Sequence, residues 1–110
     1  MALDWKTAYA SMHAHNEATF PPAGLHFVLQ LSRQIYRSHN RAVTPAELLE
    51  EFRKKTRRDF GPLEQQVLDD WGIHTPEDLG KAVALLGRYG CLTLEPTDTV
   101  EAFAALGVRP

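Results

Sequence analysis

The residues best suited to chemistry in this sequence of 110 residues are five histidines and a single cysteine. His13 and His15 are two positions apart, which places them on opposite sides of the helix that their neighbours predict. The other histidines, His26, His39 and His74, are scattered along the chain with no cysteine nearby. Zinc sites need ligands at short, regular spacings. The pattern therefore predicts no metal site and no cofactor, and histidines that are exposed or half-buried.

Candidate catalytic groups do not combine either. Ser38 and His39 are adjacent, and neighbours on a helix do not face each other. Asp69 and Asp70 diverge by about 100° on a helix, which is poor geometry for a paired acid and base. Cys91 follows a glycine in an apolar stretch, where a buried structural thiol is commoner than a nucleophile. We find no catalytic motif, leave enzyme status open and favour a non-enzymatic protein.

Hydrophobic spacing predicts a mainly α fold, a compact bundle of about five or six short helices. The expected helices cover residues 3–13, 23–38, 45–60, 62–71, 76–89 and 99–106. The second is expected to be central, because its apolar arc is wide and includes Tyr36. Residues 41–43 and 91–95 could form one short strand pair, giving a winged-helix-like variant. We divide the chain into an N-terminal helix and linker (1–22), a single helical domain (23–106) and a C-terminal tail (107–110).

Helix boundaries are marked by local signals. Thr44 and Thr75 each precede a proline and acidic residues, as N-caps do. Gly72 stands where a helix-ending glycine belongs, and Ile73 should then contact Leu68. The fifth helix carries a strip of small residues that predicts close helix packing, with the floor of a partner's groove as the alternative: Gly80, Ala84 and Gly87.

Charge is unevenly distributed, although the net charge is only −2. Residues 1–58 hold nine Lys/Arg against five Asp/Glu, a balance of +4, whereas residues 59–110 hold three against nine, a balance of −6. Two aspartates also occupy the last turn of the fourth helix, where the helix dipole disfavours each by roughly 0.3–1 kcal/mol. Internal salt bridges to the basic run of the third helix are the favoured explanation, and a charged docking surface is the alternative.

Trp71 is expected in the core, with a partly exposed hot spot as the alternative. The candidate interaction residues are Arg53, Lys54, Arg57, Arg58, Asp69, Asp70 and Trp71.

The stretch FGPLEQQVLDDWGIHTPEDLGKAVALL (residues 60–86), with ELLEEF before it and EPTDTVEAF after it, resembles the Minf-type family of uncharacterised small bacterial proteins. The resemblance covers roughly residues 25–103 and rests on Phe60-Gly61-Pro62 followed by Trp71-Gly72-Ile73. The chain departs from the pattern at residues 41–43 and at Leu79. The resemblance implies a bacterial protein with this helical unit, and it implies no activity.

Two functions are compatible with these features. The first is a non-enzymatic protein-interaction module or subunit, whose partner is another protein or a second copy. The second is a winged-helix-like nucleic-acid binder, which is less favoured because the expected reading helix begins with Glu77 and Asp78 and offers only Lys81 and Arg88. A single cysteine, no signal-peptide pattern and no apolar stretch of about 20 residues predict a cytoplasmic protein that does not bind membranes.

Overall fold

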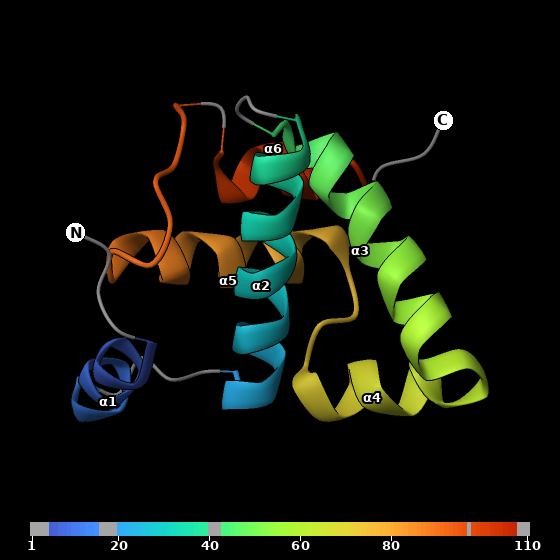
Figure 1. The fold of residues 1–110 in the computed structure, drawn as a ribbon, viewed down its shortest axis with the longest axis horizontal. Helices are drawn as coiled ribbons and strands as arrows, with labels where there is room; N and C mark the ends of the chain where they lie inside the picture. Colours follow the sequence, from blue (N-terminus) through green and yellow to red (C-terminus); the bar gives the residue numbers. More distant parts are fainter. Residues whose placement is uncertain (1–4, 16–19, 40–42, 97, 108–110) are drawn as a thin grey trace.

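The computed structural model describes residues 5–15, 20–39, 43–96 and 98–107, and the part of the chain that it describes is helical with short connections (Figure 1). The prediction of a mainly α fold is confirmed. The elements are α1 (Trp5–Ala14), α2 (Pro22–His39), α3 (Pro45–Phe60), the 3-10 helix η1 (Gly61–Leu63), α4 (Glu64–Trp71), α5 (Pro76–Arg88) and α6 (Val100–Ala105).

The core forms around α2 and α5, which cross each other in the middle of the molecule, with α3 and α4 on one side (Figure 1). These two helices bury most of their apolar side chains, and α6 packs along α5. The short helix α1 adds Ala8 and Met12 to the same apolar cluster. The side chains of α2 and α5 that are almost completely buried include Leu25, Val28, Leu29, Leu79, Ala82 and Leu86.

The predicted strand pair is not present in the described residues. Residues 41–42 of its first strand lie outside them, and residues 91–95 of its second form an irregular segment. The Cys91 N–H donates to the Leu86 carbonyl at 2.9 Å, so the segment begins by closing the end of α5. Leu92 and Leu94 then pack against the core while Thr93 is exposed. The alternation of apolar and polar residues in this segment therefore reflects packing of a loop against helices. A strand was predicted because a loop with one buried side gives the same alternation as a strand.

The helix junctions follow the predicted signals. Thr44 and Thr75 each form a capping box, with Glu47 and Asp78 respectively. Gly72 adopts the left-handed conformation with φ 72°, and the Ile73 N–H donates to the Leu68 carbonyl at 3.1 Å. These local predictions are confirmed because each depends on residues within one or two helical turns.

Replacing Gly72 by alanine is expected to lower the free energy of unfolding by about 1 kcal/mol, because a Cβ is disfavoured at positive φ. No atom lies within 4 Å of the position that the new Cβ would occupy, so the cost comes from the backbone alone. Urea denaturation measures it. Gly72→Asn is the matched control, since asparagine tolerates this conformation better. An alanine variant as stable as the wild type would contradict the assignment.

The small-residue strip of α5 permits close packing, as predicted. A Cβ added at Gly80 would lie 2.7 Å from the Cβ of Phe103 in α6, which is closer than real contacts allow. A Cβ added at Gly87 would overlap Leu94. At Gly80 and Gly87 the strip is therefore covered by this chain itself, so the alternative of an open groove floor is wrong at both positions.

Candidate interaction surfaces

The basic run predicted from the sequence lies on the solvent side of α3. The helix buries Leu48, Leu49, Phe52 and Thr56, so its cations face outward. Thr56 is a polar residue in this buried row, and its hydroxyl donates to the Glu64 carboxylate at 2.6 Å, which ties the start of α4 to α3. The core face of α3 thus fixes the orientation of its basic face.

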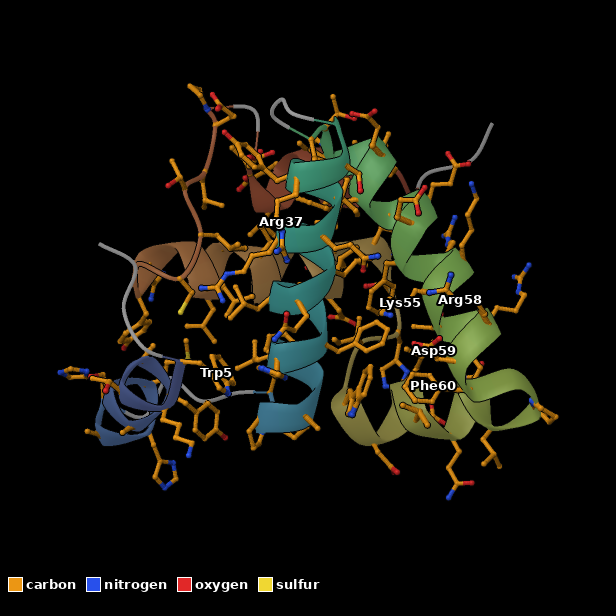
Figure 2. All side chains as sticks on the ribbon, in the orientation of Figure 1. Trp5, Arg37, Lys55, Arg58, Asp59 and Phe60 are labelled. Carbon is orange, nitrogen blue, oxygen red and sulfur yellow. The ribbon has the colours of Figure 1, made fainter. Side chains whose placement is uncertain are left out.

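Some of these cations pair with acidic residues of their own helix. Lys54 lies 3.1 Å from Glu50, and the hydrogen bond to that carboxylate raises the pKa of Lys54. Asp59 accepts from Lys55 at 3.1 Å and is 3.3 Å from Arg58, and the hydrogen bond from Lys55 lowers the pKa of Asp59 (Figure 2). All of these contacts are at the surface, where ion pairs contribute little to stability. Their effect is to neutralise part of the basic run locally.

Arg53 and Arg57 remain available for an outside partner. Both are exposed, they are one helical turn apart, and neither guanidinium contacts a carboxylate within the described residues. They border a hollow of about 190 Å³ between α3, α4 and the start of α5. Its apolar lining includes Leu68, Ile73 and Leu79. Two of the four predicted basic residues therefore form a cationic edge beside an apolar depression.

The predicted salt bridges between the basic run and the aspartates of α4 are wrong. The Asp69 carboxylate lies 3.1 Å from Nδ1 of His74 and accepts from Gln65 at 3.0 Å. Asp70 is exposed and has no side-chain partner in the described part of the chain. The basic residues meet acids one turn away on α3 first, because side chains three or four positions apart are neighbours on a helix. A charged docking surface, the alternative explanation for the basic run and for Asp70, is therefore the one that remains.

Trp71 belongs to the core. Its side chain is 9% exposed, and its ring centroid lies 5.0 Å from that of Phe27 and 5.4 Å from that of Phe60. Gly24 of α2 packs directly on the indole, since a Cβ there would be 2.9 Å from the Trp71 Cγ. The alternative of a partly exposed hot spot does not hold in this structure, because the indole is packed among core residues.

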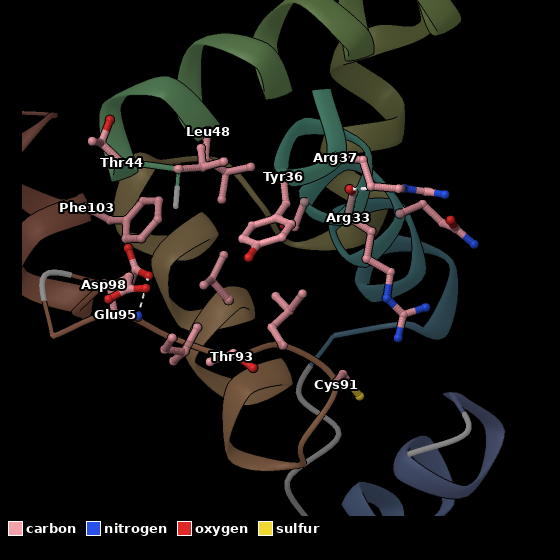
Figure 3. Close-up of a pocket in the computed structure, with 16 residues that line it drawn as sticks. Arg33, Tyr36, Arg37, Thr44, Leu48, Cys91, Thr93, Glu95, Asp98 and Phe103 are labelled. Carbon is pink, nitrogen blue, oxygen red and sulfur yellow. Dashed lines mark hydrogen bonds between the residues drawn. The ribbon is translucent and has the colours of Figure 1, made fainter. Parts of the chain in front are cut away.

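A larger cleft of about 680 Å³ lies between α2, the start of α3, α6, residues 91–95 and Asp98 (Figure 3). Leu48, Val83 and Phe103 give it an apolar lining. Figure 3 shows Arg33 and Arg37 at one end and Glu95 and Asp98 at the other, with the ring of Tyr36 between the two ends.

Sequence reasoning missed this cleft. It assigned Tyr36 to the buried arc of the central helix, but Tyr36 is 58% exposed because the helices leave that side of α2 open above the cleft. One feature of the sequence could have indicated a charged surface on this side of α2. The sequence of α2 contains no acidic residue, so Arg33 and Arg37 have no carboxylate at helical spacing to pair with.

The remaining chemical groups stay dispersed. Cys91 is buried at the edge of the cleft, and burial raises the pKa of its thiol, with Arg33 acting in the opposite direction. Within the described residues no three His, Cys, Asp or Glu side chains gather as a metal site would require. None of the helices described combines the length and the apolar character that a membrane span needs.

Comparisons with family models, curated proteins and solved structures returned no match to this chain. The resemblance to the Minf-type family therefore remains a prediction from sequence, and the functional argument rests on the two surfaces: the Arg53–Arg57 edge with its hollow, and the cleft beside α2.

Proposed function

We propose that this protein is a non-enzymatic interaction module that binds an acidic surface of another protein through Arg53 and Arg57. The observation that carries the proposal is their position: both are exposed, one turn apart and unpaired within the described residues, beside an apolar hollow. The proposal needs no catalytic group.

The chemistry of arginine defines the partner. A guanidinium can bind a carboxylate through two parallel hydrogen bonds, and it is less strongly hydrated than an ammonium group. Residues at this spacing have Cβ atoms about 5–6 Å apart. A partner would therefore present two carboxylates at a similar separation, such as a pair one turn apart on a helix. An apolar side chain between them would enter the hollow of about 190 Å³.

Nucleic-acid binding is the alternative use of the same cations, because phosphates also attract arginine. The structure offers it less support. The expected reading helix, α5, is packed between α2 and α6, and its first turn carries Glu77 and Asp78. The strand pair that would form a wing is not present in the described residues. The alternative thus depends on non-specific phosphate contacts from α3 alone.

The test is an affinity capture from the native lysate, with and without nuclease, using tagged wild-type protein and two charge-reversed double variants. We expect a defined protein partner that survives nuclease. Arg53→Glu/Arg57→Glu should reduce its recovery at least about tenfold, which is the effect of losing roughly 1.4 kcal/mol of binding free energy. Lys54→Glu/Arg58→Glu is the matched control, because it makes the same charge change at the same helical spacing on α3 with exposed cations that already pair with Glu50 and Asp59, and it should leave recovery close to that of the wild type.

Equal recovery with the α3 variant and the wild type would contradict the proposal. Captured nucleic acid that disappears with nuclease or moderate salt would support the alternative instead. Thermal unfolding of both double variants must match the wild type, and exposed substitutions of this kind normally change stability by only about 0.5 kcal/mol.

A further inference from the structure

One wall of the cleft beside α2 is the segment of residues 91–95, whose middle N–H groups have no hydrogen-bond acceptor in the described part of the chain. At its ends, the Cys91 N–H donates to Leu86 and the Glu95 N–H donates to the Asp98 carboxylate at 2.8 Å. Between them, the N–H groups of Leu92, Thr93 and Leu94 make no hydrogen bond to any described residue. Figure 1 shows this segment rising from the end of α5 along the outside of the bundle. Unpaired backbone groups of this kind are a template for another strand.

The side chains of the segment already suit such pairing. Leu92 and Leu94 are partly buried against the core, and Thr93 between them is exposed. A strand with one covered face shows this same alternation. The Leu94 side chain also packs over Gly87, so the segment is held against α5 by contacts that an incoming chain need not disturb.

Charges at the two ends of the cleft define what could enter it. Neither guanidinium of Arg33 and Arg37 contacts a carboxylate in the described residues, and the Nε of Arg37 lies 3.4 Å from a carbonyl of its own helix. At the far end, the Asp98 carboxylate is engaged by the Glu95 N–H, whereas the Glu95 carboxylate has no described partner. The cleft therefore favours a ligand with a negative group toward α2 and a positive or neutral group toward Glu95.

We propose that this cleft binds an extended peptide segment of a partner protein, which pairs with the backbone of residues 92–94 and places an acidic side chain against Arg33 and Arg37. Main-chain hydrogen bonds would provide affinity, and the apolar lining with Tyr36 and Phe103 would select alternate side chains. The volume of about 680 Å³ is within the roughly 300–1,000 Å³ range of ligand pockets. The inference rests on the proposed role as an interaction module, but it concerns a surface separate from Arg53 and Arg57.

The experiment is selection of displayed random peptides on the full-length protein. Peptides of about seven residues span roughly 23 Å when extended, which is enough to cover the segment and both charged ends. We expect enriched sequences with an acidic residue near one end and alternating apolar residues. A synthetic peptide of the enriched sequence should lose at least about tenfold in affinity with Arg33→Glu/Arg37→Glu. It should bind the matched variant Arg53→Glu/Arg57→Glu like the wild type.

Amide hydrogen exchange of the same complex tests the backbone pairing. At least one of the amides of Leu92, Thr93 and Leu94 should exchange at least about tenfold more slowly with the peptide bound, because a hydrogen-bonded amide is protected. Three results would each overturn the inference: no enriched peptide, equal affinity for the Arg33→Glu/Arg37→Glu variant, or unchanged exchange at all three amides. Lysate capture that depends on Arg53 and Arg57 would still stand in those cases, so the two proposals fail separately.

Discussion

Replacing Trp71 by alanine is expected to lower the free energy of unfolding by about 3–5 kcal/mol, because large aromatic side chains in a core contribute that much. The indole is 9% exposed and packs against the rings of Phe27 and Phe60. Gly24 of α2 packs directly on the indole, so loss of the ring removes packing contacts with α2 as well. Domains of this size are stable by only about 5–15 kcal/mol. The variant should therefore show a much lower melting temperature in circular dichroism.

Leu63→Ala is the control for this prediction. Leu63 is a large apolar residue of the same region, but it is 62% exposed, and its loss should change stability by no more than about 0.5 kcal/mol. A Trp71→Ala variant that kept wild-type stability while losing a captured partner would restore the hot-spot interpretation and contradict the packing described for this residue.

Replacing Phe103 by alanine should have an effect of similar size, again about 3–5 kcal/mol. Phe103 is 1% exposed and is the residue through which α6 enters the core. A helix as short as α6 does not persist in water without such packing. We therefore expect the loss of α6 helicity together with the loss of stability, measured by urea denaturation and by amide exchange in residues 100–105. Glu101→Ala, an exposed substitution on the same helix, is the control.

A double-mutant cycle with Gly80 makes this prediction more specific. In the wild type, Gly80→Ala should be destabilising by about 1–2 kcal/mol, because its Cβ would meet the Cβ of Phe103 at 2.7 Å. With Phe103→Ala the ring atoms Cγ and Cδ2, which would lie 2.9 and 3.1 Å from the new Cβ, are gone, although the Cβ of residue 103 remains. Gly80→Ala should then cost less than in the wild type, since alanine is also the better helix former by about 1 kcal/mol. Equal effects of Gly80→Ala in the two backgrounds would show that the two residues are not in the contact described.

The parts of the fold that were predictable from sequence are those determined by neighbouring residues. Three such features are the threonine N-caps, the end of α4 at Gly72 and the amphipathic helix α3. Each depends on residues within a few positions, so the local sequence is enough to predict it. The segment at residues 91–95 was misassigned because its alternation has two physical explanations. Strand pairing and packing on helices both bury every second side chain, and only the tertiary structure distinguishes them.

The candidate sites were predicted less well, because charge pairing depends on distance in space. The sequence showed an excess of positive charge before an excess of negative charge, which suggested bridges from α3 to α4. In the structure Lys54, Lys55 and Arg58 pair within α3, and Asp69 pairs with His74. The cleft beside α2 was missed for the same reason, since Arg33 and Glu95 come to one cavity only through the tertiary fold.

The contact between Gly87 and Leu94 has a consequence for how the cleft could change. Gly87 does not line the cavity, yet the missing side chain at that position determines how near residues 91–95 come to α5. A larger residue there would push the wall outward and alter the width of the opening while every lining side chain stayed the same. The width of this cleft thus depends on residue 87, which does not line it. A substitution there would change which ligands fit the cleft without changing any side chain that contacts them.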